Sequence, residues 1–417
     1  MTEHRIPPQA DFALLWVAET IGQVGMQITV LGLPLAAIMI LKATPLEVGA
    51  LRALEWLPFL LISLLVGIWV DRRRRRPILI AGNIGRACIL LAIPLAFALG
   101  ALSLWQLYSV AFLAGILSVF FDVASQSYLP SLIARDQLVR GNALLEASRS
   151  GAGIVGPSIA GALIGFLTAP MAIVVNVLGF LMSAVLLGCI RRDEPEPDRR
   201  VNKAGRLSLM RDEIIDGLRY VRRQRTLRAI AAFSAASNLG FSLVESIFLI
   251  YAVRQLRLNV GEIGLMYAVG NIGLLAGAVF AGPLAVRIGL GRTLIVSSGL
   301  QGLSLVPVPL AALASPLLLL ITGQLLRTCG VVLFNVTAAS LRQAMTPDHL
   351  RGRMNATMRF VGWGIIPVGS VLGGVVATLA SVQVTLWIGA IAGLLAIVPV
   401  ALSPLRTIHH LPSLTEG

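Results

Sequence analysis

The chain has 417 residues, of which 56% are hydrophobic and 13% are charged, and its mean hydropathy is +0.84. These values lie outside the range of soluble globular proteins and predict an integral membrane protein. The formal net charge of +14 would suit a nucleic-acid partner only if the basic residues gathered on one soluble surface.

Apolar runs of about 20 residues, the length that spans roughly 30 Å of hydrocarbon, predict twelve membrane-spanning helices. In the first half they cover residues 12–40, 48–70, 78–100, 104–129, 142–167 and 171–190. In the second half they cover residues 227–253, 263–285, 293–313, 317–341, 354–379 and 382–403. The first run is too long and too polar for a cleaved signal peptide, so we expect the chain to keep its N-terminus.

The distribution of Lys and Arg predicts the topology. When the loops are numbered alternately, 26 of the 34 basic residues fall on the side that holds both termini and five fall inside helices. The other side holds Lys42, Arg254 and Arg257. The positive-inside rule therefore places both termini in the cytoplasm of a bacterial inner-membrane protein. Because topology explains the basicity, we expect no nucleic-acid partner.

The long hydrophilic stretch 191–226 divides the chain into two sets of six helices. Its charged and proline-containing start, RRDEPEPDRR, predicts a flexible linker. Apolar residues at helical spacing from Leu207 to Val221 then predict an amphipathic helix on the inner leaflet, among the lipid headgroups. We therefore expect an N-terminal bundle (1–190), a cytoplasmic linker (191–226) and a C-terminal bundle (227–417).

Three pairs of short motifs recur in the same order in the two halves. GIWVDR at 67–72 corresponds to GPLAVR at 282–287, an offset of 215 residues, and VGPSIAG at 155–161 corresponds to VGSVLGG at 368–374, an offset of 213. Asn142-Ala143 corresponds to Asn355-Ala356 at the same offset of 213. The fold class is thus predicted as all-α, with two six-helix bundles related by a parallel pseudo-twofold repeat and able to rock about a central site.

The stretch GIWVDRRRRRP resembles the loop signature of the major facilitator superfamily, Gly-x-x-x-Asp-Arg-x-Gly-Arg-Arg. It matches at Gly67, Asp71, Arg72, Arg75 and Arg76, and differs at Arg74, where the pattern has Gly. The stretches FFDVASQSYLPSLIARDQLVRGNALLEASRSGAGIVGP and LRQAMTPDHLRGRMNAT resemble an exporter branch that includes enterobactin-exporter-like and macrolide-efflux-like proteins. The resemblance implies a carrier of small molecules whose helices 1, 4, 7 and 10 line the cavity.

Motifs for other kinds of chemistry are absent or misplaced in the sequence. There is no Gly-x-x-x-x-Gly-Lys-Ser/Thr stretch for ATP, and the Gly-x-Gly-x-x-Gly match at residues 151–156 lies inside an apolar helix. The small residues around Gly156 instead predict close helix packing, with a bend at Pro157. In the superfamily a Gly-Pro signature on helix five is associated with antiport, although Ala152 and Ala160 replace two of its glycines. The scattered His and Cys residues predict no metal site, no disulfide and no cofactor.

Ten charged residues fall inside the predicted spans, where each costs roughly 2.5 to 3.5 kcal/mol at mid-bilayer. They are Glu19, Arg52, Glu55, Arg86, Asp122, Glu146, Arg149, Glu245, Arg327 and Arg359. We expect these side chains to be paired or to face a wet cavity. Spacing of one helical turn predicts local pairs between Arg52 and Glu55 and between Glu146 and Arg149.

Two polar stripes point to the coupling site. Helix 1 carries Glu19, Gln23 and Gln27 at steps of four, and helix 4 carries Asp122 and Gln126 in the same register. Glu19 and Asp122 each lie about 10 Å from the cytoplasmic ends of their helices, at matched depth. We hypothesise that they carry the coupling proton or bind a cationic group of the substrate. The alternative is that both acids only set helix packing.

The second half offers a set of cavity candidates on helices 7 and 10. These are Asn238, Glu245, Gln324, Arg327 and Asn335. Their alternative role is hydrogen bonding between helices.

The repeat also predicts a conformational latch. If each signature loop docks on the opposite bundle, Asp71 would meet Arg359 and Arg287 would meet Glu146, beside Arg149. Simple pairing along one helix is the alternative for Glu146 and Arg149.

Together these observations predict a secondary transporter that is not an enzyme. We expect a monomeric, proton-coupled exporter of a small amphipathic molecule such as a drug, an antibiotic or a siderophore. An importer or symporter of the same fold is the first alternative, and a transport-inactive sensor or scaffold is the second.

Overall fold

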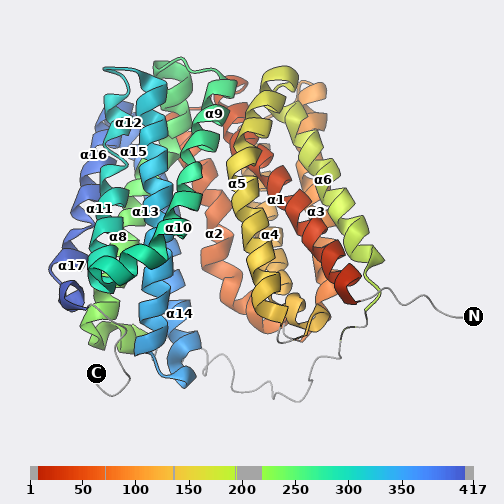
Figure 1. Cartoon of the computed structure of the whole chain (residues 1–417). Helices are drawn as coiled ribbons and strands as arrows, with labels where there is room; N and C mark the ends of the chain where they lie inside the picture. Colours follow the sequence, from red (N-terminus) through yellow and green to blue (C-terminus); the bar gives the residue numbers. More distant parts are fainter. Residues whose placement is uncertain (1–7, 71, 135–136, 193, 195–217, 409–417) are drawn as a thin grey trace, which may run out of the picture. The chain divides into compact units, whose positions relative to one another are not determined.

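The computed structural model describes residues 8–408 except 71, 135–136, 193 and 195–217, and the regular structure in this part of the chain is helical (Figure 1). Eleven of the described helical segments are long and apolar enough to cross a membrane. The second predicted span corresponds to a further helix, Pro45–Val70. The predicted all-α membrane fold is confirmed.

The contacts between Cα atoms divide the chain into two compact units. Unit 1 holds residues 1–201 and 259–268, and unit 2 holds residues 202–258 and 269–417. The helices that precede the long hydrophilic stretch are α1 (Pro8–Met39), α2 (Pro45–Val70), α3 (Arg75–Ala98), α4 (Leu104–Leu132), α5 (Leu138–Leu167) and α6 (Ala169–Cys189).

The spans of the second half are mostly interrupted. Their segments are α8 (Arg225–Ile250) with the π-helical η2 (Tyr251–Gln255), α9 (Val260–Gly270), α10 (Ile272–Ile288), α11 (Leu290–Leu303), α12 (Pro307–Leu310), α13 (Pro316–Met345), α14 (Asp348–Trp363), α15 (Ile365–Leu379), α16 (Val382–Leu395), α17 (Val398–Ala401) and the 3-10 turn η3 (Pro404–Thr407). The predicted amphipathic helix at Leu207–Val221 falls mainly outside the described residues.

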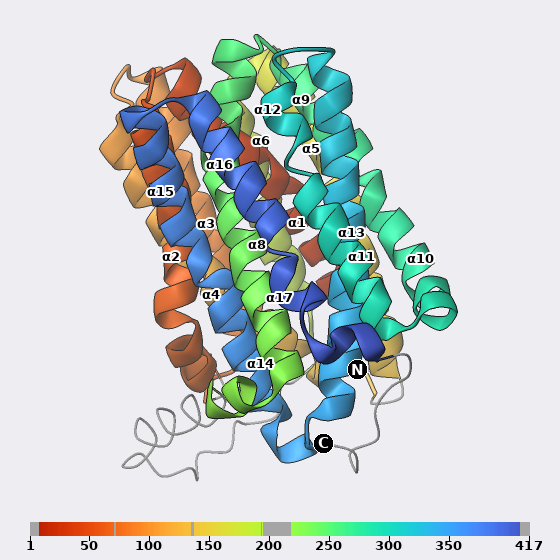
Figure 2. The ribbon, with the colours of Figure 1, turned by 90° about the vertical axis from the view of Figure 1, so that its left-hand side faces the viewer.

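Helix packing inside the two units follows one pattern. In unit 1, α1 packs on α5 and α6, α4 packs on α2 and α3, and α3 packs on α6. In unit 2, α8 packs on α15 and α16, α13 packs on α10 and α11, and α11 packs on α16 (Figure 2). If the spans of each half are numbered from one to six, the same five pairs of spans pack together in both units, as a parallel repeat requires.

Short turns with defined caps fix where the helices of unit 1 reverse. The Ser103 side chain accepts a hydrogen bond from Gln106 N at the start of α4, as an N-cap serine does. Gly100, just before it, has a φ of +67°, which glycine adopts without steric cost.

A Cβ on Gly115 of α4 would lie 2.9 Å from the Glu55 carbonyl oxygen, so α4 approaches α2 closely at this glycine.

The segment that follows α6 is fastened to unit 1. Arg191 N donates to Asp11 Oδ1 of α1 at 3.2 Å, and Arg192 Nη1 donates to the Leu132 carbonyl of α4 at 2.5 Å. The Glu194 carboxylate accepts from the backbone of Arg75 at the start of α3. The beginning of the predicted flexible linker is therefore part of the end of the bundle.

Candidate functional site

Glu19 of α1 lies buried against α4. Its side chain is only 8% exposed, and its Oε1 accepts a hydrogen bond from the Ser125 hydroxyl, which is itself buried. A buried carboxylate inside an apolar bundle is costly unless a donor satisfies it, and Ser125 supplies that donor. The contact joins the two helices on which the sequence predicts the coupling site.

Asp122 lies one turn before Ser125 on α4 and is partly exposed. The charges of Asp122 and Glu19 are close enough to interact, so the structure brings the two predicted carboxylates into one cluster. Of the other stripe residues, Gln23 is half-buried and Gln126 is exposed.

Arg86 of α3 supplies a buried positive charge to this cluster. Its side chain interacts electrostatically with both Asp122 and Glu19. The guanidinium lies between the rings of Phe121 and Phe180, 4.3 Å from each ring centroid, and Nη2 donates to Asn83 Oδ1 at 2.5 Å. Stacking and hydrogen bonding both compensate a buried guanidinium, which explains how an arginine with 6% exposure is tolerated here.

Asn83 fixes this arginine in turn. Asn83 Nδ2 donates to Ser183 Oγ of α6 at 2.8 Å, while its Oδ1 accepts from Arg86. The amide therefore joins α3 to α6 and orients the guanidinium toward α4. We call Glu19, Asp122, Ser125, Arg86 and Asn83 the charged cluster of unit 1.

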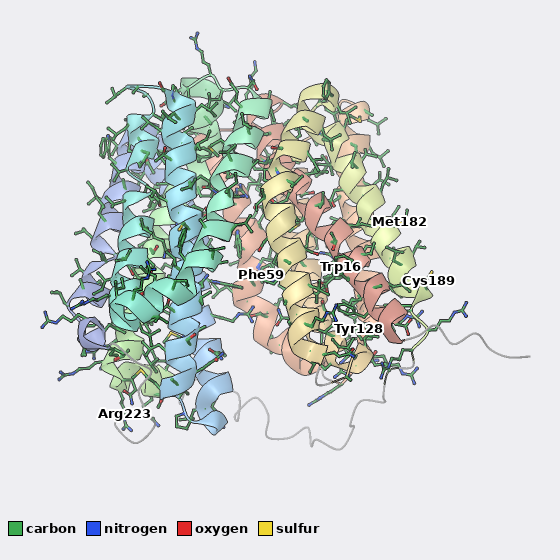
Figure 3. All side chains as sticks on the ribbon, viewed as in Figure 1. Trp16, Phe59, Tyr128, Met182, Cys189 and Arg223 are labelled. Atoms are coloured by element: carbon green, nitrogen blue, oxygen red, sulfur yellow. The ribbon has the colours of Figure 1, made fainter. Side chains whose placement is uncertain are left out.

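Further contacts hold α1 against α5. Trp16 of α1 is labelled in Figure 3, and its Nε1 donates to Ser148 Oγ of α5 at 2.6 Å. A Cβ on Gly156 would lie 2.5 Å from Cγ of Gln27, so the end of the predicted polar stripe packs directly on this glycine. The close packing predicted for the small residues of α5 is therefore confirmed at Gly156.

Another face of α5 meets α9 inside unit 1. A Cβ on Gly161 would lie 3.1 Å from Gly264 Cα, and a Cβ on Gly264 would lie 2.6 Å from the Pro157 carbonyl oxygen. The small-residue stretch of α5 thus allows two helix backbones to touch. Pro157 lies inside α5, which continues past it to Leu167.

The two predicted local ion pairs are confirmed. Arg52 Nη1 lies 3.1 Å from Glu55 Oε2, and Arg149 Nη1 lies 3.7 Å from Glu146 Oε2. The second pair is more than half exposed, whereas the first is largely buried. The charge of Arg149 also reaches Glu19.

The candidates of unit 2 include interhelical contacts. Asn238 Nδ2 donates to the Gly362 carbonyl at 2.8 Å, and Gln324 Nε2 donates to Asn271 Oδ1 at 2.9 Å. These bonds support the alternative role that the sequence left open for both residues.

Arg327, Glu245 and Asn335 differ in their surroundings. The Arg327 guanidinium lies 3.2 Å from the ring centroid of Phe241, which ties α13 to α8. Glu245 is half-buried on α8, and Asn335 is exposed on α13. Arg327 and Glu245 thus remain the charged candidates of unit 2.

Two arginines of the predicted latch are bound inside unit 1. The backbone N and Nη1 of Arg75 donate to the Glu194 carboxylate, the latter at 3.1 Å. Arg76 Nε donates to the Leu187 carbonyl at 3.0 Å, and its Nη2 donates to the Gly188 carbonyl. Arg75 and Arg76 therefore fasten the start of α3 to the end of α6, where cations suit the unpaired carbonyls.

The remaining latch residues are placed as follows. Asp71 lies outside the described residues. Gly67 lies in the last turn of α2, and Arg72 lies in the turn that follows this helix. Arg287 is exposed on α10, and the Arg359 guanidinium lies 4.7 Å from the ring centroid of Trp363 on the same helix. The pairing of Asp71 with Arg359, and of Arg287 with Glu146, stays a prediction.

Sequence reasoning did not assign Arg86 or Ser125 to the site. Arg86 is on the third span, which the family resemblance places outside the cavity, and Ser125 is an ordinary small polar residue. The signal for Arg86 was the cost of a lone buried cation, which demands an anion within reach. A second signal was that Asn83 and Arg86 are three residues apart, because residues at this spacing share a helix face and can bind each other.

Comparison with known proteins agrees with this architecture. The sequence profile described as Major Facilitator Superfamily matches residues 15–367 and 230–414. The chain belongs to the Major Facilitator Superfamily. It is therefore a multi-pass membrane transporter of small molecules, and not an enzyme.

Relatives in this superfamily cover nearly the whole chain. An uncharacterized MFS-type transporter y4rN from Sinorhizobium fredii is 27% identical over 396 residues, which are 94% of this chain and 95% of that protein. The multidrug efflux pump Tap from Mycolicibacterium fortuitum is 25% identical, over 89% of this chain and 90% of the pump. Among solved structures, an inward-facing bacterial homologue of the iron transporter ferroportin matches with a TM-score of 0.76 and 19% identity, over 95% of this chain and 99% of that one. This last likeness shows the superfamily fold alone.

Proposed function

We propose that this superfamily member is a proton-coupled exporter that exchanges protons for a small amphipathic organic molecule, such as a drug, an antibiotic or a siderophore. The observation that carries the proposal is the charged cluster, in which buried Glu19 is bound by Ser125 and shares the counter-charge Arg86 with Asp122. The membrane is the bacterial inner membrane, with both termini in the cytoplasm, in keeping with the distribution of basic residues.

The charges of the cluster give a reason for exchange. Glu19 and Asp122 together carry two negative charges when ionised, and Arg86 carries one positive charge. Arg149 acts on Glu19 more strongly than Arg86 does, but its positive charge is offset by the Glu146 carboxylate, 3.7 Å away, so this pair adds no net charge to the count. One negative charge is left to be compensated, either by a proton or by a cationic group of the substrate.

Competition for this single charge is the basis of antiport. An uncompensated charge within the membrane costs several kcal/mol, roughly 2.5 to 3.5 on insertion scales, so both the empty and the doubly occupied forms are disfavoured. A substrate cation that enters displaces the proton, and a proton that enters releases the substrate. The relation to a multidrug efflux pump at 25% identity supports the outward direction and the amphipathic substrate.

Reconstituted protein tests the proposal. The full chain is placed in proteoliposomes with an imposed pH gradient, and proton flux is read by an internal pH dye after addition of tetraphenylphosphonium, tetracycline, a macrolide or a catecholate siderophore. At least one of these should drive proton movement opposite to its own. Movement in the same direction would instead show a symporter.

Variants of the carboxylates locate the coupling. Glu19→Gln and Asp122→Asn should abolish substrate-driven proton flux while the protein remains folded. Glu47→Gln is the matched control, because Glu47 is a half-buried acid whose oxygen accepts from Thr44 at the start of α2, and an amide oxygen can accept the same bonds. Full substrate gradients in the Glu19→Gln and Asp122→Asn proteins would refute the proposed site.

A further inference from the structure

The five consecutive arginines that follow α2 lie in two different environments. Arg75 and Arg76 bind Glu194 and the carbonyls at the end of α6. The three preceding arginines, Arg72, Arg73 and Arg74, instead line a groove of about 840 Å³ at the junction of α2, α3 and α4. We call it the α2–α4 groove, and its size is that of ordinary ligand sites, roughly 300 to 1,000 Å³.

The walls of the α2–α4 groove are apolar. They include Trp69 of α2, Ile78 of α3, and Leu117 and Phe120 of α4. The Trp69 and Phe120 rings meet edge to face, with centroids 5.4 Å apart, and the Arg73 guanidinium lies 5.5 Å from the Trp69 centroid. The groove thus has an ordered aromatic wall with cations at one end.

The groove lies at the edge of the membrane. α2 ends at Val70 and α3 begins at Arg75, so the arginines sit where two spans meet the aqueous phase. Trp69 is 45% exposed and lies one residue before the end of α2, and tryptophan at the end of a span prefers the headgroup region. The apolar wall extends from there along the spans, toward the acyl chains.

We propose that the α2–α4 groove binds one anionic phospholipid, with its phosphate among Arg72, Arg73 and Arg74 and the upper part of an acyl chain along Trp69, Leu117 and Phe120. Guanidinium groups bind phosphate oxygens by paired hydrogen bonds. Three arginines also repel the ammonium group of a zwitterionic headgroup, so an anionic headgroup is favoured. Among the described residues that line the groove, none is acidic. A free phosphate would contact only the arginines and would leave the apolar wall without a bound partner.

The site would act on the same helix as the charged cluster. Phe120 lines the groove, Phe121 stacks on Arg86, and Asp122 interacts with Arg86. Three successive residues of α4 therefore face the lipid, the counter-charge and the carboxylate site. The binding proposal does not depend on proton coupling, because it rests on the groove alone.

Native mass spectrometry of the full-length protein tests the binding. Delipidated protein is titrated with phosphatidylglycerol, and with phosphatidylcholine of the same acyl chains. One phosphatidylglycerol should bind in clear preference. Because each basic residue near an anionic lipid surface contributes about 1 kcal/mol, Arg73→Gln with Arg74→Gln should weaken this binding about 30-fold.

A second pair of arginines is the control for charge. Arg222→Gln with Arg223→Gln removes the same two charges from the start of unit 2, where neither residue lines the groove. This control should retain the tight phosphatidylglycerol. Equal weakening in both double variants would show a diffuse electrostatic effect and overturn the proposal.

A steric variant tests the apolar half of the site. Ala81, exposed on α3, lines the groove, so Ala81→Trp should fill it and lower phosphatidylglycerol binding without any change of charge. Glycerol 3-phosphate, which has no acyl chain, should not compete at concentrations that saturate the lipid. Unchanged lipid binding in Ala81→Trp, or equal binding of phosphatidylcholine, would refute a lipid site in this groove.

Discussion

The Ser125 hydroxyl of α4 donates a hydrogen bond to the buried carboxylate of Glu19 on α1. Both side chains are less than one tenth exposed, so this bond is made inside the bundle. The titratable carboxylate of α1 is therefore hydrogen-bonded to a neutral donor on α4. Because the bond joins α1 to α4, we expect a movement of α1 against α4 to change the surroundings of the Glu19 carboxylate.

Removal of the hydroxyl should change the proton dependence of transport. Ser125→Ala leaves the Glu19 carboxylate without this donor, and hydrogen bonds to charged groups contribute about 1.5 to 3 kcal/mol. The pH profile of substrate-driven exchange should shift in Ser125→Ala. In Ser125→Thr, which keeps a hydroxyl, the profile should match that of the unchanged protein. Ser109→Ala, an exposed serine bonded to its own helix at Trp105, is the control. A profile that is identical in all four proteins would contradict this prediction.

Loss of Arg86 should be severe because it removes a buried positive charge that interacts with both Asp122 and Glu19. Removing one partner of a buried ionic group costs about 3 to 5 kcal/mol, so Arg86→Met should lower stability in a detergent denaturation series by that amount. Combining it with Asp122→Asn should restore part of the loss, since the second change removes the unbalanced charge. Additive losses in the double variant would show that the two side chains act independently.

Gly156 and Gly165 on α5 form a matched pair. A Cβ at Gly156 would collide with Gln27 of α1, while a Cβ at Gly165 would meet nothing within 4 Å. Gly156→Ala should therefore lower thermal stability by about 1 to 3 kcal/mol, as overpacking does. Gly165→Ala should be neutral or stabilising by about 0.5 to 1 kcal/mol, because glycine is unfavourable inside a helix. Equal effects of the two changes would exclude close packing as the reason for Gly156.

Arg76 should contribute stability inside unit 1. Its guanidinium binds carbonyls of Leu187 and Gly188, which would otherwise end α6 without partners. Arg76→Gln should cost about 1 to 2 kcal/mol in thermal unfolding. Arg73→Gln, on a neighbouring exposed arginine, should cost less than about 0.5 kcal/mol. A larger loss at Arg73 than at Arg76 would reverse this assignment.

The predicted latch can be tested by charge exchange. If Asp71 meets Arg359 in one conformation, Asp71→Arg should reduce transport, and Arg359→Asp in the same protein should restore at least part of it. The rate of exchange in proteoliposomes is the measurement. Arg287→Asp combined with Glu146→Arg applies the same test to the second predicted pair. No rescue in either combination would leave local pairing as the role of these charges.

The spans were readable from the sequence because a membrane imposes one simple rule on every segment. Each crossing needs about 20 apolar residues with its backbone bonded internally, and this pattern is visible in the chain alone. The close packing at Gly156 and the local pair of Arg52 with Glu55 were predictable for a similar reason, since spacing along one helix fixes which residues share a face. The interruptions of the second-half spans, such as the break at Asn271 between α9 and α10, were not predicted, because the apolar residues on both sides together have the length and composition of a single span.

The sequence by itself determined the membrane class, the helical spans, the duplication and the positions of the costly charges, because all of these depend on local composition and spacing. Only the tertiary structure decided which side chains of the charged cluster meet across helices. It assigned Arg86 to Glu19 and Asp122, gave Glu19 its donor Ser125, and divided the five arginines between the end of α6 and the α2–α4 groove. These pairings join helices that are distant in the chain, and the rotation and depth at which such helices pack are set by many contacts at once rather than by the pattern of any one segment.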